Sequence, residues 1–370
     1  MKRILVSGCG PASINFVKSV RIAPEKIGIV GTDINKYHIF LSQADKNYLV
    51  PRATDINYIE KLNEIIVKEK IEFLHPQPDI EVAVISEKRE KLEAFTFLPS
   101  KKTIQVCQDK FLTTKVWKKR GIRTAKTFEL KNEKDVEKAF NELGSPVWIR
   151  AKRGAGGRGS TPASNKETAL AWIKYWKSRS KDLEFIAQEY LDGRNLAFHS
   201  LFKNGELVVS MARERLEYIY PYLAPSGITG TPSVQRTLHD ANLNKIGIEA
   251  VLAVDSKYNG IACVDLKENN EGIPCPTEIN AGRMFTTSYF FSFAGSKLHS
   301  ECNMPVNWFA NIPYLYLRLA YRETIPQIPK VNILPENLYW VRHMDAPARL
   351  IRNGRVLGTV LSRESHESLD

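Results

Sequence analysis

Two acidic residues and one amide in the stretch 262–284 could together hold a divalent metal ion. Asp265 and Glu278 lie in two short apolar runs that flank Asn269-Asn270-Glu271-Gly272. Apolar runs separated by Asn and Gly are typical of a β-hairpin. If Glu271-Gly272 is a two-residue turn, Asp265 lies directly opposite Glu278 on the neighbouring strand.

Two prolines in the second strand indicate how this pair is oriented. Pro274 and Pro276 have no N–H to donate, so both must occupy positions whose N–H would point away from the partner strand. Glu278 has the same parity, which predicts a non-hydrogen-bonded pair with Asp265, with Cα atoms roughly 4.5 Å apart. Two carboxylates at that spacing repel each other unless a cation lies between them.

The predicted ligand set is Asp265, Glu278 and Asn280, because residues 278 and 280 point to the same face of a strand. A few hard oxygen ligands suit Mg²⁺, with Mn²⁺ as an alternative ion, and Mg²⁺ is usually shared with substrate phosphates. The hairpin therefore indicates a nucleotide site. The competing interpretation is a surface hairpin whose acids are only solvated.

A glycine-rich, basic segment follows the predicted strand 146–150. Four glycines lie within six positions, and glycine backbone N–H groups can cradle phosphates; they are Gly154, Gly156, Gly157 and Gly159. The segment carries three cations in addition to Arg150, namely Lys152, Arg153 and Arg158. A loop that closes over nucleotide phosphates is the favoured interpretation, and a basic hairpin tip is the alternative.

Strands alternate with helices over about the first hundred residues, which predicts a parallel α/β sheet. The glycine turn after the first strand lacks the third glycine of a dinucleotide-binding fingerprint, since Ser13 occupies its place, so a βαβ turn without a cofactor is favoured. Asp33, Gln77 and Asp79 follow predicted strands. They could face a ligand or act as caps and turn residues.

Lys110 lies in the first turn of a helix that Asp109 is expected to cap. A cation there does not stabilise the helix dipole, so the side chain is free to reach an anion. Further along, Asn204-Gly205 predicts a hairpin between two strands within 196–213. Residues 217–235 are predicted to form a long irregular loop, a usual location for function.

The composition is that of an ordinary globular protein. The chain has 370 residues, 43% of them hydrophobic and 25% charged, which predicts two or three domains. No apolar run is long enough to span a bilayer, and the apolar run after the basic start is too short for a signal peptide, so we expect a cytoplasmic protein without a membrane partner. Five scattered cysteines indicate neither a disulfide framework nor a zinc site. The net charge of +12 is spread along the chain, so nucleic acid is not the expected partner.

Taken together, the chain resembles an ATP-grasp enzyme, and most closely a single synthetase unit of the carbamoyl-phosphate synthetase large subunit. The resemblance also includes the run Gly227-Ile228-Thr229-Gly230-Thr231-Pro232. It implies an α/β protein with an N-terminal parallel, Rossmann-like pre-ATP-grasp domain over 1–100. An ATP-grasp fold of two α+β subdomains would follow over 101–370, with 125–190 as a mobile lid.

The resemblance assigns roles to individual residues. Lys110 and Arg150 would contact ATP phosphates, under a lid formed by the glycine loop. The adenosine contacts would come from Gln188, Glu189, Leu191 and Asn195, although the family usually has Glu at the first and last of these positions. Arg283 lies one residue later than the family's arginine because Gly282 intervenes, and Arg283 and Arg150 are the predicted catalytic residues.

The implied reaction is attack of a small-molecule carboxylate on the γ-phosphate of ATP, followed by capture of the acyl phosphate by an amine or another nucleophile. Positioning and electrostatic stabilisation dominate such phosphoryl transfers. An alternative is phosphorylation of carbamate or a related carboxylate, without ligation. A third possibility, from another class, is a non-catalytic nucleotide- or nucleic-acid-binding protein. A homodimer is a family-level expectation.

Overall fold

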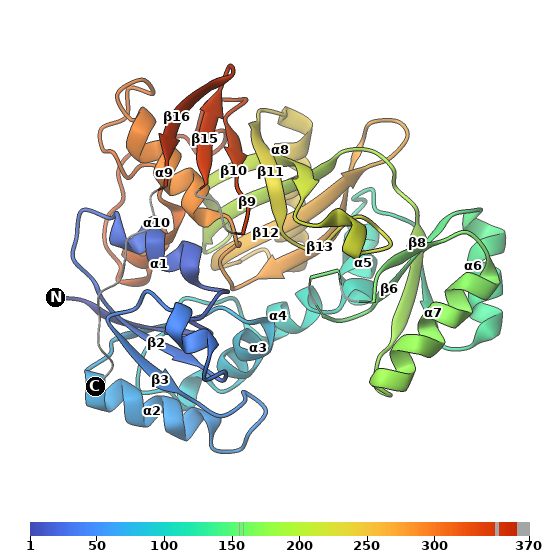
Figure 1. The fold of residues 1–370 in the computed structure, drawn as a ribbon, viewed down its shortest axis with the longest axis horizontal. Helices are drawn as coiled ribbons and strands as arrows, with labels where there is room; N and C mark the ends of the chain where they lie inside the picture. Colours follow the sequence, from blue (N-terminus) through green and yellow to red (C-terminus); the bar gives the residue numbers. More distant parts are fainter. Residues whose placement is uncertain (155, 158, 345–347, 361–370) are drawn as a thin grey trace.

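A computed structural model describes residues 1–154, 156–157, 159–344 and 348–360. The described residues form three β-sheets, of four, eight and four strands, with helices packed on them (Figure 1). The predicted α/β class, with a parallel N-terminal sheet followed by mixed α and β structure, is confirmed.

The N-terminal sheet is parallel and has the strand order β3-β2-β1-β4. Its strands are β1 (Arg3–Ser7), β2 (Gly28–Asp33), β3 (Lys46–Leu49) and β4 (Phe73–Pro76). Successive side chains of β1 enter different cores: Ile4 and Val6 lie in one, and Leu5 lies in the other. Burial on both faces explains why this strand is continuously apolar rather than alternating.

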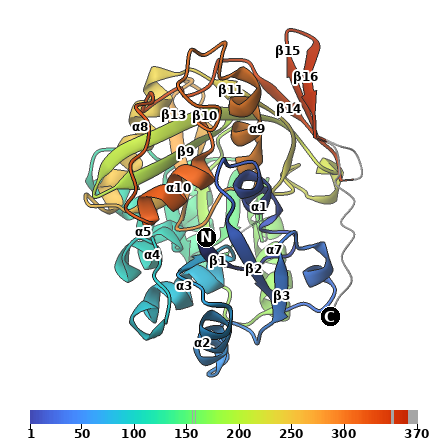
Figure 2. The ribbon, with the colours of Figure 1, turned by 90° about the vertical axis from the view of Figure 1, so that its left-hand side faces the viewer.

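Helices cover both faces of this sheet. They are α1 (Ile14–Arg21), α2 (Tyr58–Glu69) and α3 (Asp79–Glu87), with 3-10 turns at His38–Leu41 and Arg89–Lys91. The first helix, α1, also packs against α9 (Ser288–Leu298) and α10 (Ile312–Ala320) from the far end of the chain (Figure 2). One hydrophobic core therefore joins the N-terminal sheet to the C-terminal helices, with Phe16 and Tyr316 among its members.

Two helices, α4 (Lys101–Cys107) and α5 (Lys110–Lys119), lead into a small antiparallel sheet with the order β5-β8-β6-β7. Its strands are β5 (Thr127–Leu130), β6 (Val147–Ala151), β7 (Thr161–Ala163) and β8 (Phe185–Glu189). Helices α6 (Glu133–Leu143) and α7 (Lys166–Arg179) pack on it around a separate core that includes Ile149 and Phe185. This unit projects at the right of Figure 1.

The eight-stranded sheet runs β13-β12-β9-β10-β11-β14-β15-β16 and is antiparallel throughout. Its strands are β9 (Asn195–Lys203), β10 (Glu206–Tyr218), β11 (Pro232–Leu238), β12 (Gly260–Glu268), β13 (Pro274–Ala281), β14 (Tyr339–Val341), β15 (Arg349–Arg352) and β16 (Arg355–Thr359). Helix α8 (Ala241–Val254) packs on one face, where Phe198 and Val264 are buried.

No helix in the described part of the chain combines the length and apolar character needed to traverse a bilayer.

The β12–β13 hairpin pairs Asp265 with Glu278 as predicted, but the predicted two-residue turn is wrong. The ladder ends at Glu268 opposite Pro274, so five residues connect the strands. Within this connection the Asn269 side chain accepts from the N–H groups of Glu271 and Ile273, and Gly272 has a φ of 72°. A register shift beside Asp265 compensates for the longer turn and restores the predicted pair.

Residues 217–235 are also more regular than predicted. The end of β10 and the beginning of β11 occupy both ends of the segment, and a 3-10 turn spans Pro221–Leu223. Because β10 and β11 pair with each other, the intervening residues form the tip of a long hairpin. That hairpin carries residues 226–231 to the cavity described next.

Candidate active site

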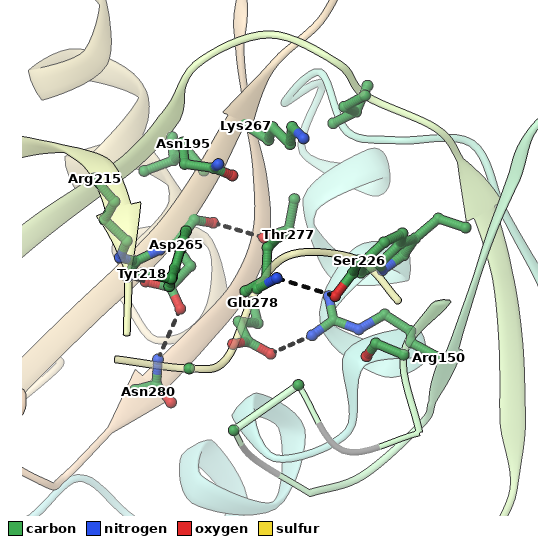
Figure 3. Close-up of a pocket in the computed structure, with 18 of the residues that line it drawn as sticks. Arg150, Asn195, Arg215, Tyr218, Ser226, Asp265, Lys267, Thr277, Glu278 and Asn280 are labelled. Carbon is green, nitrogen blue, oxygen red and sulfur yellow. Dashed lines mark hydrogen bonds and ion pairs between the residues drawn. The ribbon is translucent and has the colours of Figure 1, made fainter. Parts of the chain in front are cut away.

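The carboxyl groups of Asp265 and Glu278 project from neighbouring strands into one cavity (Figure 3). The side chain of Asp265 is 16% exposed and that of Glu278 is 22% exposed. Both carboxylates are therefore largely shielded from water but still open to an ion in the cavity. Asn280 lies beside them, and its Nδ2 donates to Asp265 Oδ2 at 3.3 Å. All three predicted metal ligands are therefore together, and their oxygen donors fit Mg²⁺.

The two acids differ in their electrostatic surroundings. Burial raises the pKa of Asp265, and the Glu278 carboxylate adds to this rise, although Arg215 forms an ion pair with Asp265. For Glu278, burial alone would also raise the pKa. The neighbouring cations Arg150 and Lys110 outweigh burial and hold the pKa of Glu278 below its usual range. A divalent ion between the two acids would relieve their mutual repulsion.

Two cations from outside the hairpin, Arg150 and Lys110, contact Glu278. Arg150 Nη2 lies 2.6 Å from Glu278 Oε2, and Lys110 Nζ lies 3.4 Å from the same oxygen. Arg150 comes from β6 of the small sheet, whereas Lys110 begins α5, where Asp109 accepts from two backbone N–H groups as the predicted cap. Burial lowers the pKa of Lys110, partly offset by Glu278.

The glycine loop after β6 lies over this cluster. Lys110 Nζ donates to the Gly154 carbonyl at 2.6 Å, and Gly156 and Gly157 line the cavity. Gly154, Gly156, Gly157 and Gly159 all have positive φ, a conformation that glycine adopts without strain. Ala155 and Arg158, which the sequence also placed in this loop, lie outside the described residues.

The same loop touches the tip of the β10–β11 hairpin across the cavity. A Cβ at Gly157 would lie 3.1 Å from the Ile228 carbonyl oxygen, and a Cβ at Gly230 would lie 3.1 Å from Gly156 Cα. The two loops therefore meet over the cavity, so closely that a side chain at either glycine would push the facing backbone away. Neither contact was predicted, since each loop was interpreted separately.

Gly157→Ala is expected to lower kcat/KM about tenfold for the ATP-dependent reaction that the resemblance implies, because the added methyl group separates the loops and strains a positive-φ position. Gly121→Ala is the matched control, since Gly121 has a φ of 74° and open space around it, away from the cavity. Steady-state kinetics and thermal unfolding of both variants test this. Equal loss of activity in the two variants would contradict a role for the loop contact.

The predicted adenosine contacts line the other end of the cavity, whose volume is about 380 Å³. Gln188, Glu189, Leu191 and Asn195 are all in its wall. Gln188 is buried, and its Nε2 donates to Thr127 Oγ1 at 3.0 Å. Asn195 pairs with Lys267 across β9 and β12, so Lys267 also reaches this wall.

Arg283 connects the cavity to the N-terminal sheet. Its Nη2 donates to Asn280 Oδ1, and its Nε lies 2.6 Å from Asp79 Oδ1. Asp79 is thus the one member of the predicted strand-end set that contacts a cavity-lining residue. Gln77 instead hydrogen-bonds the backbone of Met284, and Asp33 accepts from the N–H groups of Gly10 and Asn35.

Several cavity residues were missed as individuals, among them Arg213, Arg215, Tyr218 and Ser226. The first two lie at alternate positions of β10, on the face that carries Asp265. Charged residues two apart in an apolar strand are a signal that could have identified them. In the described part of the chain, no three His, Cys, Asp or Glu side chains are grouped so that they could hold a metal ion. The predicted set has two acids and one amide.

Two family models match the chain in order. Residues 4–97 match the PylC-like N-terminal domain, and residues 107–287 match the ATP-grasp domain. Residues 107–287, just under half of the chain, are thus similar to an ATP-grasp domain. The ATP-grasp match contains Lys110, the glycine loop and the Asp265–Glu278 hairpin.

Known ATP-grasp proteins resemble this one at low identity. D-alanine–D-alanine ligase B of Clostridium perfringens is 27% identical over 202 residues, which cover 52% of this chain and 63% of the ligase. The chain therefore matches less than two thirds of that relative's length.

Two solved structures share the fold. The biotin carboxylase domain of 2-oxoglutarate carboxylase from Hydrogenobacter thermophilus has a TM-score of 0.69 at 18% identity, with 94% of this chain and 74% of that one covered. Carboxyaminoimidazole ribonucleotide synthase from Aspergillus clavatus has a TM-score of 0.66 at 16% identity, with coverage of 92% and 81%. These relatives do not single out carbamoyl-phosphate synthetase, so the resemblance to that enzyme in particular is not shown.

Proposed function

We propose that this ATP-grasp protein is an ADP-forming ligase that activates a small-molecule carboxylate with ATP and Mg²⁺ and joins it to an amine or another nucleophile. The observation that carries this is the convergence of an acid pair, two cations and a glycine loop on one cavity. The likeness to D-alanine–D-alanine ligase B, and the MgADP named with the 2-oxoglutarate carboxylase domain, support it.

In this proposal Asp265, Glu278 and Asn280 hold magnesium, which when bound neutralises phosphate charge. Arg150 and Lys110, freed from Glu278, then hold the phosphate oxygens of ATP. The backbone N–H groups of the glycine loop add fixed dipoles to the same oxygens, and they need no reorganisation during the reaction. Gln188 and the backbone at Glu189 and Leu191 contact adenine. The Asn195 side chain accepts a hydrogen bond from a ribose hydroxyl.

Arg283 is proposed to orient the reacting carboxylate, because it lies beside Asn280 and is steadied by Asp79. The carboxylate oxygen attacks the γ-phosphorus while the bond to the ADP oxygen breaks, which gives an acyl phosphate and ADP. The nucleophile then attacks the acyl carbon, loses its proton and expels phosphate. The domain boundary lies near residue 100, and residues 125–190 form a lid over the cavity. Closure of this lid excludes water while the acyl phosphate exists.

Hydroxylamine should trap the acyl phosphate as a hydroxamate when the correct acid, ATP and Mg²⁺ are present. A panel of metabolite carboxylates, first ranked by thermal shift with a non-hydrolysable ATP analogue, supplies the acids. Hydroxamate and ADP are measured together by colorimetry and a coupled assay. ATP binding without ADP or hydroxamate formation with any acid that the protein binds would contradict ligase activity.

Phosphorylation of carbamate is a second candidate, as in a carbamoyl-phosphate-synthetase-like unit. The segment that resembles a synthetase loop lies at the cavity, where Ile228, Thr229, Gly230 and Thr231 line the wall. This candidate predicts ADP formation with bicarbonate and ammonia and no amide product. The same assay without an organic acid separates it from the ligase.

A further inference from the structure

Arg213 is a buried cation in the cavity wall without a carboxylate partner. Among the described residues, four arginines line the cavity, and three of them form ion pairs: Arg150 with Glu278, Arg215 with Asp265, and Arg283 with Asp79. Arg213 is 2% exposed, and no acid among the described residues pairs with it. A buried charge without a partner is costly, so its presence in a cavity indicates that a ligand supplies the counter-charge.

The guanidinium of Arg213 is hydrogen-bonded to the ring of His199. Arg213 Nε donates to His199 Nε2 at 2.5 Å, and the fully buried His199 ring stacks on Phe285 with 3.9 Å between ring centroids. Burial, reinforced by Arg213 itself, lowers the pKa of His199 well below its usual value, so the ring is a neutral acceptor. Arg213 Nη1 is buried and has no hydrogen-bond partner among the described residues.

The position of Arg213 relative to the acid pair follows from the strand register. Glu278, Asp265, Ala197 and Arg213 are consecutive cross-strand partners in one row over β13, β12, β9 and β10. Asp265 and Arg213 are thus two strands apart, roughly 10 Å between Cα atoms, with Ala197 between them in the row and Arg215 reaching Asp265 from beside it. A short molecule can therefore lie along this row, with one end near the acid pair and the other at Arg213.

We propose, resting on the ligase function above, that the acid substrate carries a second anionic group, a carboxylate or a phosphate, and that Arg213 binds it. The first carboxylate is phosphorylated beside Asp265 and Glu278. The second pairs with the free Nη edge of Arg213, whose fork suits either anion. Arg213 thereby selects dianionic acids over monocarboxylates of the same length.

The charge state of Arg213 agrees with this role. Burial and the neighbouring Arg215 lower the pKa of Arg213 to about 9, against a smaller opposing effect of Cys263 and of the Asp265 carboxylate, which forms its ion pair with Arg215. Arg213 is therefore still a cation near neutral pH. Arg342, which is mostly buried and has an unpartnered Nη2, lies close enough to contribute to the same lowering. An anion bound between these side chains would relieve their repulsion.

Three probes of equal chain length test the proposal: butyrate, succinate and 3-phosphonopropionate. Binding of each is titrated by thermal shift with Mg²⁺ and a non-hydrolysable ATP analogue present. We expect at least one dianion to bind wild-type protein at least tenfold more tightly than butyrate, which is about 1.4 kcal/mol. The succinate and phosphonate arms distinguish a second carboxylate from a phosphate. Equal binding of all three probes, or no binding of any, overturns the proposal.

Three variants complete the test. Arg213→Gln should lose the preference for the dianion and keep its affinity for the nucleotide. Arg213→Lys should keep part of the preference for the dianion. This variant still tests the proposal if Arg213→Gln does not fold. Arg236→Gln is the control, because Arg236 lies on the same sheet and pairs with Glu214 away from the cavity. A preference that survives in Arg213→Gln overturns the proposal. Failure of the wild-type protein to bind the nucleotide would instead contradict the ligase function itself.

Discussion

Glu278→Gln is expected to lower turnover on the order of 10³-fold, about 4 kcal/mol of transition-state stabilisation, while the fold is retained. The substitution keeps the shape of the side chain but removes the charge that faces the proposed magnesium ion. It also frees Arg150 and Lys110, which lie 2.6 and 3.4 Å from the carboxylate. Binding of ATP without magnesium should therefore be as tight as in the wild type or tighter, and the stimulation by magnesium should disappear.

Glu214→Gln is the matched control for this experiment. Glu214 is also largely buried and pairs with Arg236 at 2.7 Å, but it lies on β10 with its side chain away from the cavity. Turnover, nucleotide affinity with and without Mg²⁺, and thermal unfolding are measured for both variants. Full activity in Glu278→Gln, or the same loss in both variants, would remove Glu278 from the metal site.

Acid is expected to destabilise the protein through His75. Burial lowers the pKa of this side chain to about 4, opposed only in part by the hydrogen bond with Gln77. In the unfolded chain the pKa is about 6.5, so between these two values the unfolded state binds the extra proton. The stabilisation is fully present above about pH 6.5 and falls as the pH drops toward 4, by about 3 kcal/mol in total.

The surroundings of His75 explain why it stays neutral. Its ring stacks on Phe16 at 4.2 Å and lies between the Tyr316 hydroxyl, 3.3 Å from Nδ1, and Gln77 Oε1, 3.1 Å from Nε2. Gln77 Oε1 also accepts from the Met284 N–H, so it is an acceptor, and the proton of the ring is on Nε2. Protonation of Nδ1 would bury a charge between the N-terminal sheet and α10.

His75→Gln removes the titration and keeps a group that can donate and accept. Urea unfolding at pH 7.0, 6.0, 5.0 and 4.5 should show the wild type more stable at pH 7.0 and the difference shrinking as the pH falls. Other titrating groups, including the buried His199, affect both proteins alike and cancel in the difference. A constant difference over this pH range would show that His75 is not the acid-sensitive group.

Local patterns in the sequence were sufficient for much of the site. The prolines and the Asn-Gly punctuation predicted the hairpin and its Asp265–Glu278 pair, because side-chain parity along a strand is a local property. The glycines at 154–159 predicted a loop after the strand 146–150, and Asp109 predicted the cap that precedes Lys110. The turn of that hairpin was nevertheless misassigned, since an Asn side chain that caps a longer turn competes with the two-residue form.

Contacts between distant segments were decided only by the tertiary structure. The ion pair of Arg150 with Glu278 joins residues 128 positions apart, and the pair of Arg283 with Asp79 joins the segment after β13 to the first residue of α3. No local pattern sets such distances, because they depend on how the three sheets pack. The same is true of Arg213, whose burial and pairing with His199 arise from the register of β9 against β10 and β12.

The sequence by itself determined the types of groups that could do chemistry and the strand faces on which they lie, since these follow from backbone periodicity. Only the tertiary structure decided which cations are neutralised by an acid and which face the cavity alone. Charge balance depends on through-space distance and burial, and neither quantity is encoded in the spacing of residues along the chain.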